Sequence, residues 1–477
     1  MTDDTQRPLV VDLDGTLINT DTLMESLMLF LKVNPLRIFL LFIWVLKGKA
    51  YFKHQVAERV DLNVASLPYN DAVLDLIRSA RDAGRPCYLA TGAVHKYADA
   101  IAEYTGLFDG VYATDSATSV NFTGKDKAEG LIRQFGEFEF DYVGNSSVDL
   151  RVWNHSHTAY VVSASSSLSA RAADVSKHVV KLDAPKRTLK TWIKGIRVHQ
   201  WVKNSLIAIP LFTSHQFLDV ELLSLVALGI LAFSLAASSV YVLNDLLDLE
   251  SDRQHPSKCK RPFASGAIPV HYGLALFPVL LFSAFVISLF LPLPFVAALG
   301  LYYLLTVAYS FKLKQVILLD TIVLAALYTM RIIAGTLLIN VAFSFWLLAF
   351  SVFIFLSLAL VKRYTELVLM MAKGETKTIG RGYHGTDAPI VAAFGCAAGY
   401  IAVMVLALYV NSAEVLELYS NPSLLWLACL VMLYWISRVW MLAHRGQMHD
   451  DPIVFAVKDM QSLVTGIVVA SVFFLAT

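Results

Sequence analysis

The sequence carries little charge for its length. Only 16% of its 477 residues are Asp, Glu, Lys or Arg, and 56% are hydrophobic. An average soluble domain has about 25% charged residues. This composition does not fit an ordinary soluble protein and indicates a membrane protein, long enough for two or three domains.

Cysteine is also scarce. The four cysteines are scattered and show no paired-thiol spacing, so neither a zinc site nor a disulfide framework is indicated. The formal net charge of +1 says little about partners, because the positive residues are unevenly placed. We expect no nucleic-acid partner, and the sequence does not indicate an oligomeric state.

Residues 1–185 are expected to form a soluble α/β domain. Short apolar runs at 8–12, 86–91 and 140–144 predict buried strands, and 71–83 predicts an amphipathic helix. Apolar strands that alternate with helices are typical of a parallel sheet.

One segment of this half is unusually apolar. Residues 36–46 contain nine hydrophobic residues in succession, flanked by Arg37, Lys47 and Lys49. The segment is too short to span a bilayer. Two alternatives remain open, a buried helix and a helix at a membrane interface.

Residues 186–477 are expected to form an all-α membrane domain of nine transmembrane helices. The apolar segments are 203–217, 221–243, 270–291, 293–311, 316–339, 342–361, 388–411, 422–443 and 453–476. All but the first are long enough for a hydrocarbon core of about 30 Å. The first is short and interrupted by Pro210.

The distribution of Lys and Arg predicts the orientation. Four alternate loops, at 214–221, 289–295, 338–343 and 411–422, contain no Lys or Arg. The basic residues gather in the other loops: Lys258, Lys260, Arg261, Lys312, Lys314, Lys362, Arg363, Lys373, Lys377, Arg381 and Arg445. Because basic loops stay in the cytoplasm, we expect a plasma-membrane protein with a cytoplasmic N-terminus. The chain opens with a polar stretch and no secretory signal, which agrees.

An acidic stripe follows the second apolar segment. Asn244, Asp248 and Asp252 recur every four residues, so they share one helix face, with Asp245 beside them. Carboxylates in a membrane require a bound cation or water. Oxygen ligands of this kind suit Mg²⁺, which usually holds phosphate groups as well. The stripe therefore predicts a membrane enzyme that acts on a diphosphate.

Further polar groups are expected at the same level of the membrane. Lys258 and Arg261 follow the stripe, where they could bind outer phosphate oxygens. A second constellation comprises Tyr309, Lys314 and Asp320. Arg331 is a cation inside a span, which marks a functional cavity.

Together these motifs resemble the UbiA superfamily of intramembrane prenyltransferases, and within it the decaprenyl-phosphate phosphoribosyltransferase branch. The likeness is carried by Gln200-Trp201-Val202-Lys203-Asn204, by Asn244-Asp245-x-x-Asp248-x-x-x-Asp252, by His255-Pro256-x-Lys258-x-x-Arg261-Pro262 and by Tyr309-Ser310-x-x-Leu313-Lys314. It implies transfer of 5-phosphoribose from phosphoribosyl diphosphate to a polyprenyl phosphate. By the same likeness the four stripe residues would hold Mg²⁺ and the sugar diphosphate, with Asp248 and Asp252 as catalytic residues. The substrate-binding set would be Lys203, Asn244, Lys258, Arg261, Tyr309, Lys314, Asp320 and Arg331.

An alternative activity is a UbiA-type prenyltransferase that makes a quinone, haem or lipid precursor from a prenyl diphosphate. Quinone-type relatives often have a second acidic residue four positions after the one at 320, and this sequence has none at 324. That departure disfavours aromatic prenylation.

The first half carries a second set of chemical groups. Asp12 and Asp14 follow a predicted strand directly, with Gly15 for the turn. Two carboxylates so placed can serve as nucleophile and general acid. Thr91 follows the next strand, and Lys127 and Asp149 lie further along the chain.

This set resembles the haloacid dehalogenase superfamily of phosphohydrolases, with residues 20–70 as the cap of a Rossmann-like fold. The likeness implies that Asp12 forms an aspartyl-phosphate and Asp14 protonates the leaving oxygen. Thr91 and Lys127 would bind the phosphoryl group, and Asp12, Asp14 and Asp149 would hold Mg²⁺. Asn145 stands where the family usually has Asp, so a degenerate, non-catalytic domain is the alternative. If the domain is active, it is expected to dephosphorylate the phosphoribosyl lipid and yield a pentose donor for cell-envelope glycans.

Overall fold

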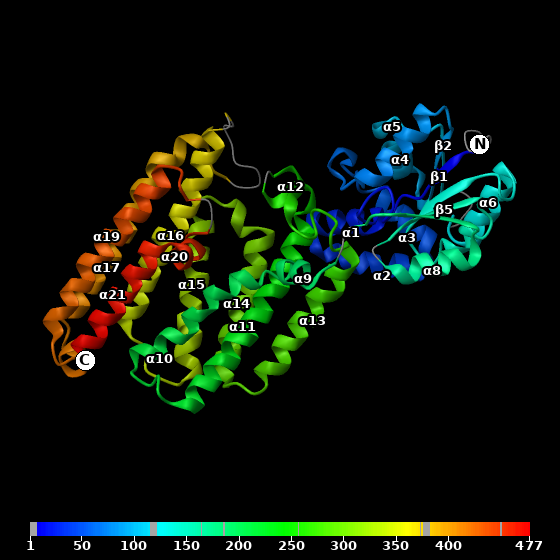
Figure 1. Cartoon of the computed structure of the whole chain (residues 1–477). Helices are drawn as coiled ribbons and strands as arrows, with labels where there is room; N and C mark the ends of the chain where they lie inside the picture. The colour runs from blue at the N-terminus through cyan, green and yellow to red at the C-terminus, as the bar shows by residue number, and fades with distance from the viewer. Residues whose placement is uncertain are drawn as a thin grey trace. The chain divides into compact units, whose positions relative to one another are not determined.

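The computed structural model describes residues 7–114, 122–163, 165–184, 187–255, 257–372, 374, 382–448 and 451–477 (Figure 1). Its contacts divide the chain into two compact units. The first unit is Met1–Ile196 with Tyr241–Pro278, and the second is Arg197–Val240 with Val279–Thr477. Lys373, Lys377 and Arg381, which contributed to the predicted orientation, lie outside the described residues.

The first unit contains a six-stranded parallel sheet with strand order β3-β2-β1-β4-β5-β6. The strands are β1 (Leu9–Val11), β2 (Cys87–Val94), β3 (Gly110–Thr114), β4 (Asp141–Gly144), β5 (Thr158–Val162) and β6 (His178–Leu182). The three expected strands are β1, β2 and β4, and the expected α/β class is confirmed. Residues of β1 and β4 are buried on both faces, as expected of strands covered by helices on each side.

Helices precede, connect and follow these strands in the first 196 residues. They are α1 (Thr22–Val33), α2 (Ile38–Leu46), α3 (Lys49–Ala57), α4 (Asp71–Asp82), α5 (His95–Thr105), α6 (Lys125–Phe135), α7 (Leu150–Trp153), α8 (Ser166–Val175) and α9 (Leu189–Gly195). The amphipathic helix expected at 71–83 is α4, which Asn70 caps by accepting a hydrogen bond from Ala72 N. It buries Val73, Ile77 and Ala80, one face of the helix.

The apolar segment at 36–46 contains α2. Only Leu41 and Trp44 of this helix are buried, against a small cluster that includes Phe30 and Val56. Phe39 and Phe42 are each 65% exposed. The helix is therefore not a buried one, and its placement at a membrane interface stays a prediction.

Seven helices of the described chain are long and apolar enough to cross a membrane. They are α11 (Val220–Leu247), α13 (Val270–Ser288), α14 (Leu293–Phe311), α15 (Leu319–Leu338), α16 (Phe345–Ala372), the segment Gly385–Val410 that contains α17 (Ala388–Val410), and Pro422–His444, which contains α19 (Leu425–His444). An eighth span is present if the pair α20 (Pro452–Lys458) and α21 (Met460–Ala476), bent by 83°, counts as one. The class of apolar helical domain is confirmed, but the count of nine is not reproduced.

The difference lies at the first and last predicted spans. Residues 203–217 do not form one apolar helix, because the 3₁₀ segment Val198–Ala208 is followed by the short helix α10 (Ile209–Thr213), with Pro210 in its first turn. The last span is broken at Asp459, which caps α21 and accepts a hydrogen bond from Arg438 Nη1 at 2.6 Å. A charged pair at that position ends one helix and begins the next.

The second unit is held together around α16, which packs against α15 and α17. A Cβ on Gly395 of α17 would lie 2.0 Å from the Trp440 ring of α19, so the close approach requires glycine. Ser357 of α16 donates to the Gly395 carbonyl at 2.7 Å and accepts from Trp440 Nε1 at 3.1 Å. Small and polar side chains thus join three helices where the hydrophobic effect cannot drive their association.

Candidate active sites

The phosphatase-like site lies at the carboxyl ends of the central strands. Asp12 directly follows β1, which pairs with β2 on one side and β4 on the other. The carboxyl ends of parallel strands meet at one edge, the usual ligand position in such sheets. Gly15 has a φ of +75°, which lets the chain turn sharply after the two carboxylates.

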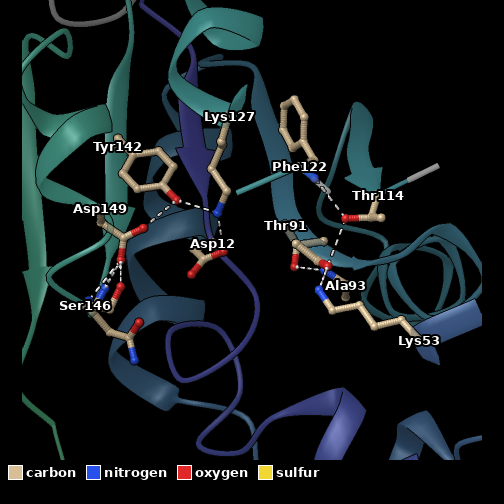
Figure 2. Close-up of polar contacts among 12 residues, drawn as sticks. Asp12, Lys53, Thr91, Ala93, Thr114, Phe122, Lys127, Tyr142, Ser146 and Asp149 are labelled. Carbon is tan, nitrogen blue, oxygen red and sulfur yellow. Dashed lines mark hydrogen bonds and ion pairs between the residues drawn. The ribbon is translucent and has the colours of Figure 1, made fainter. Parts of the chain in front are cut away.

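Four buried side chains are joined in this site, as Figure 2 shows. Lys127 Nζ donates to Asp12 Oδ1 at 2.7 Å and to the Tyr142 hydroxyl at 2.9 Å. Tyr142 in turn donates to Asp149 Oδ1 at 3.2 Å. Burial, followed by the charges of Asp12 and Asp149, raises the pKa of Tyr142 well above its ordinary value, so the hydroxyl keeps its proton and can donate.

Hydrogen bonds to the second carboxylate oxygen of Asp149 also hold this side chain in place. Its Oδ2 accepts hydrogen bonds from Asn145 N, Ser146 N and Ser146 Oγ at 3.1, 2.9 and 2.8 Å. The structure therefore brings Asp12, Lys127 and Asp149 together, and their catalytic roles stay predictions. A Cβ on Gly15 would lie 2.1 Å from Asn145 Nδ2, so the Asn145 amide lies against the turn after the paired carboxylates.

The Asp14 side chain contacts the N-terminus of α1. Its Oδ1 accepts a hydrogen bond from Thr22 N at 2.7 Å. Burial and the charge of Asp21 raise the pKa of Asp14 to about 8. Burial raises the pKa of Asp12 to about 6, against the opposing charge of Lys127. At neutral pH Asp12 is thus ionised and Asp14 is protonated, the states required of a nucleophile and a general acid, respectively.

A cleft of about 350 Å³ opens over these groups. Its lining includes four carboxylates, Asp12, Asp14, Asp21 and Asp149, but only two lysines, Lys53 and Lys127. Thr91 is fully buried nearby, and its hydroxyl accepts a hydrogen bond from Ala93 N at 3.0 Å (Figure 2). An excess of carboxylates over cations suits a bound divalent cation, so the residues present fit Mg²⁺.

The acidic stripe occupies the end of α11 and the start of α12 (Leu249–Gln254). Arg261 Nη1 bridges Asp245 and Asp252, at 3.1 and 2.5 Å from their carboxylate oxygens. Burial raises the pKa of Asp252, against the charge of Arg261. Asn244 Oδ1 is buried and accepts no hydrogen bond from the described residues.

These groups also fit a magnesium site that substrate completes. No three acidic, His or Cys side chains in the described parts of the chain converge closely enough to hold a metal alone. Mg²⁺ commonly binds one or two carboxylates and takes further oxygens from phosphate. Asn244, Asp245, Asp248 and Asp252 would hold it here, and the buried Asn244 oxygen is available as a ligand.

In the second unit, Asp320 has a cationic partner. Its Oδ2 lies 2.5 Å from Arg363 Nη2, both side chains are fully buried, and Tyr383 donates to its Oδ1 at 2.7 Å. Arg363 also pairs with Glu366. Asp320 is therefore neutralised by a guanidinium, a partner that the sequence reading did not assign.

A second buried carboxylate was missed by sequence reasoning. Asp451 Oδ2 lies 2.8 Å from Lys203 Nζ and 3.0 Å from Lys362 Nζ. The Tyr328 hydroxyl is 3.3 Å from Asp451 Oδ1. Burial alone would raise the pKa of Asp451, but the charges of Lys362 and Lys203 outweigh it and bring this pKa below the ordinary range.

Arg331 belongs to the same part of the second unit. It donates to Asn204 Oδ1 at 2.8 Å and to the Tyr302 hydroxyl at 3.0 Å. Its guanidinium lies 5.5 Å from the centre of the Tyr328 ring, and Lys203 Nζ is at the same distance from that ring. Tyr328 thus lies beside both cations and Asp451.

The remaining predicted residues are half-buried. Lys258 belongs to the 3₁₀ turn Lys258–Lys260, Tyr309 to the last turn of α14, and Lys314 to the 3₁₀ turn Leu313–Gln315. The stripe belongs to the first unit and Asp320 to the second. Their participation in one site stays a prediction.

Two kinds of residue escaped the sequence reading. Tyr142 and Lys53 carry no motif of their own and gain a role only through their contacts. Asp451 does carry a signal, an acidic residue next to Pro452 at the start of an apolar segment, but that pattern is typical of a helix cap. Asp451 does cap α20 through Ile453 N, and it also binds two lysines.

Comparisons with known proteins assign a family to each half of the chain. Residues 205–463 match the model of the UbiA prenyltransferase family, and residues 9–152 match that of haloacid dehalogenase-like hydrolases. The protein y4nM of Sinorhizobium fredii is 38% identical over 99% of this chain and 92% of its own length. The nodulation protein NoeC of Azorhizobium caulinodans is 38% identical over 59% of this chain and 91% of its own.

A further relative is named for its activity. The decaprenyl-phosphate phosphoribosyltransferase of Mycolicibacterium smegmatis is 35% identical over 40% of this chain and 61% of its own length. The apolar helices, the stripe and the family match together identify an integral membrane transferase with a phosphatase-like domain. The chain belongs to the UbiA prenyltransferase family and carries a haloacid dehalogenase-like hydrolase domain before its membrane helices.

Proposed function

We propose that the membrane region transfers 5-phosphoribose from phosphoribosyl diphosphate to a polyprenyl phosphate with Mg²⁺. The phosphatase-like domain then removes the 5-phosphate of the lipid product. The observation that carries this proposal is the acidic stripe, in which one arginine bridges two carboxylates beside a buried amide oxygen. Relatives named as decaprenyl-phosphate phosphoribosyltransferases support the choice of substrates.

In the transfer step, an oxygen of the lipid phosphate bonds to C1 of the ribose. The bond from C1 to the diphosphate breaks, and the diphosphate leaves with the electron pair. A bound Mg²⁺ would supply positive charge to that leaving group. The phosphate oxygens of the diphosphate also bind Lys258, Arg261 and Lys314. A lysine or arginine stabilises the negative charge of the leaving group because it donates charge-assisted hydrogen bonds to phosphate.

The lipid phosphate is expected to bind the cations of the second unit. Lys203 and Lys362 share one carboxylate, so this cluster keeps an excess of positive charge. Arg331 lies on the neighbouring tyrosine ring and holds its guanidinium in a fixed position through Asn204 and Tyr302. A cluster of this kind inside a membrane is typical of an anion site.

In the phosphatase step, an Asp12 oxygen attacks the phosphorus of the 5-phosphate. The bond from phosphorus to the ribose oxygen breaks, and Asp14 gives its proton to that oxygen. Water then cleaves the aspartyl-phosphate and releases inorganic phosphate, with Asp14 as the base. Lys127 holds Asp12 in place and offers a cation to the phosphoryl oxygens.

Labelled donors test the proposal directly. Membranes that contain the chain should incorporate label from phosphoribosyl diphosphate into a lipid when polyprenyl phosphate is added, and chelation of Mg²⁺ should stop it. Incorporation from a labelled prenyl diphosphate instead would assign the chain the prenyl transfer of its wider family. Membranes with the Asp248→Asn variant, expressed at the same level, provide the control.

A variant of Arg331 tests the assignment of the lipid phosphate. Arg331→Ala should raise the KM for polyprenyl phosphate far more than the KM for phosphoribosyl diphosphate. An equal rise in both KM values would remove Arg331 from the lipid-phosphate site.

The cytoplasmic orientation of both sites is part of the proposal. Phosphoribosyl diphosphate is a soluble anion, and the distribution of basic loops supports a cytoplasmic position for the stripe. A protease added to sealed inside-out vesicles should cleave the phosphatase-like domain, and in right-side-out vesicles it should not.

A further inference from the structure

Helix α1 touches both predicted sites of the first unit. At its start, Thr22 N donates to Asp14 Oδ1 in the phosphatase cleft at 2.7 Å. In its last turn, Lys32 Nζ lies 3.3 Å from Asp248 Oδ1 of the acidic stripe. Thr22 and Lys32 are ten positions apart, which corresponds to about 15 Å along a helix. One short, straight element therefore connects a carboxyl of one site to a carboxylate of the other.

Buried contacts hold α1 against the stripe. Glu25, one turn into α1, makes a two-pronged ion pair with Arg253 of α12, at 2.5 and 3.2 Å, with both side chains under 10% exposed. Thr20 also donates to Glu25 at 2.6 Å. Arg253 extends the connection by donating to the carbonyl of Ala264 at 2.8 Å. A paired and hydrogen-bonded ion pair of this kind fixes the orientation of the two helices.

The loop before α1 also makes a close backbone contact with the segment after the acidic stripe. Gly266 has a φ of +74°, and a Cβ there would lie 2.4 Å from the carbonyl oxygen of Asn19. Asn19 precedes α1, and Gly266 follows the basic segment that contains Lys258 and Arg261. The loop of the phosphatase-like domain therefore packs directly on the segment predicted to bind phosphate.

We propose that α1 forms a wall shared by both sites and that Lys32 is a diphosphate-binding residue of the transferase. This inference rests on the proposed function and names a residue outside the membrane family's motifs. The Lys32 side chain is 41% exposed, so its pair with Asp248 is weak and easily exchanged. If Asp248 held a divalent cation, the ammonium of Lys32 would be able to bind phosphate oxygens of the diphosphate instead. Arg261 bridges the other two carboxylates of the stripe, so cations flank the diphosphate from two segments.

Binding of inorganic diphosphate with Mg²⁺ tests the role of Lys32. The full chain in detergent should bind it by calorimetry, and Lys32→Ala should weaken that binding about fivefold, the effect of one partly exposed charge. Lys32→Arg should restore most of it. Arg78→Ala, which removes an exposed arginine paired with Asp75 on α4, is the matched control and should bind as the wild type does.

The same variants should separate the two activities. Lys32→Ala should raise the KM for phosphoribosyl diphosphate and leave the hydrolysis of p-nitrophenyl phosphate unchanged. Wild-type affinity of Lys32→Ala for Mg²⁺ and diphosphate would overturn the inference. A wild-type chain that binds diphosphate but transfers no phosphoribose would overturn the proposed function instead.

The Glu25–Arg253 pair tests the shared wall. Glu25→Gln should raise the KM for phosphoribosyl diphosphate and lower the kcat/KM for p-nitrophenyl phosphate together, because α1 loses its anchor to α12. The exchange Glu25→Arg with Arg253→Glu should recover part of both losses. A lower melting temperature with both kinetic constants unchanged would show a merely structural pair and contradict the wall.

A separate observation concerns α2 of the same unit. This nine-residue helix exposes most of its apolar side chains, although it belongs to the α/β part of the chain. The large side chains that α2 exposes are Ile38, Phe39, Leu40, Phe42, Ile43, Val45 and Leu46, and Val33 and Leu36 before the helix are exposed as well. An apolar surface of this kind marks an interaction site.

We infer that α2 lies in the interfacial layer of the bilayer. The first unit contains the ends of two membrane helices, Tyr241–Leu247 of α11 and Val270–Pro278 of α13, so a membrane surface borders this unit. Arg37 and Lys47 flank α2, and the helix itself contains no acidic residue, which complements anionic headgroups. Nine residues span about 14 Å, too little to cross the hydrocarbon core.

Spin labels on the full chain test this placement. In nanodiscs of phosphatidylcholine and phosphatidylglycerol, a label at Leu46→Cys should collide more with oxygen than with a water-soluble nickel complex. A label at Tyr104→Cys, exposed on α5 of the same unit, should show the reverse. Equal behaviour of the two labels would overturn the inference, and dipolar coupling between labels at 46 would assign the face to a second copy of the chain.

Discussion

The buried carboxylates of the phosphatase cleft differ from Asp451 in the number of cations around them. Four carboxylates and two lysines line the cleft, and burial raises the pKa of Asp12 to about 6 and that of Asp14 to about 8. Asp451 is similarly buried but forms ion pairs with two lysines, and its pKa is lowered. Burial raises the pKa of all three acids, and at Asp451 the charges of two lysines reverse that shift, so the number of nearby cations distinguishes the acids that can exchange a proton near neutral pH.

This difference indicates what each region can do. Carboxyls that titrate near neutral pH can act as nucleophile and acid, which suits the cleavage of a phosphate ester. A carboxylate that stays ionised between two lysines cannot exchange protons, and it instead holds those lysines in position. This arrangement is consistent with the proposed role of the second region in binding an anion.

The largest expected effect comes from the nucleophile. Asp12→Asn should lower the release of inorganic phosphate from the phosphoribosyl lipid by about a thousandfold or more, because an amide does not form the acyl-phosphate. Incorporation of phosphoribose into lipid should continue at the wild-type rate. Unchanged phosphate release would show that the domain is degenerate, as the Asn145 departure allows.

Removal of the Asp451 carboxylate, which Lys203 and Lys362 share, should destabilise the second region. Asp451→Asn leaves Lys203 and Lys362 close together with no counter-charge from this position, at a cost of about 3 kcal/mol in the free energy of unfolding. The loss should appear as a lower melting temperature in detergent, and Lys362→Met in the same chain should recover part of it. Asp75→Asn, an exposed partner of Arg78, is the control and should leave the melting temperature unchanged. A melting temperature of Asp451→Asn equal to that of the control would contradict the proposed role of this carboxylate.

The pH dependence of phosphate release should separate the two regions further. Asp12 must lose its proton to attack, so kcat/KM should rise through about pH 6, and Asp14 must keep its proton, so kcat/KM should fall above about pH 8. Asp451 stays ionised across this range and adds no limb to the profile of the transferase. A flat phosphatase profile between pH 5 and 9 would argue against the assigned protonation states.

The smallest expected effect concerns the metal affinity of the cleft. Asn145→Asp adds a carboxylate beside the turn at Gly15. Since ligand charge raises affinity, the Mg²⁺ concentration for half-maximal phosphate release should fall by about tenfold at most. Ser163→Asp, a substitution on another loop of the same domain, is the control for the added charge. An unchanged requirement for Mg²⁺ would place Asn145 outside the metal site.

Much of the phosphatase-like site could be predicted from sequence, because several of its residues lie in or shortly after predicted strands. Asp12 directly follows β1, Thr91 lies within β2, and Asp149 follows the loop after β4, and parallel strands bring their carboxyl ends to one edge. Lys127 was found through its motif. Tyr142 was not, since it lies within β4 and reads as an ordinary buried aromatic residue.

The membrane region was harder to predict. The apolar segments were found from their length and composition, but the first and last departed from simple spans at Pro210 and Asp459. The sequence indicated that Arg331 is a cation within a membrane span, but it did not predict the contacts of Arg331 with Asn204 and Tyr302. Asp320 was expected to face a diphosphate, and the structure pairs it with Arg363.

The sequence by itself determined the two classes of structure, the apolar helices and the positions of the chemical motifs. Those features depend on hydrophobic periodicity and on residues close together in the chain, which are local properties. Only the tertiary structure decided which charges meet: Lys203 with Asp451, Arg363 with Asp320, and Glu25 with Arg253, 228 positions away. An ion pair depends on distances of a few ångströms between side chains, and residues far apart in sequence reach them only once the helices have packed.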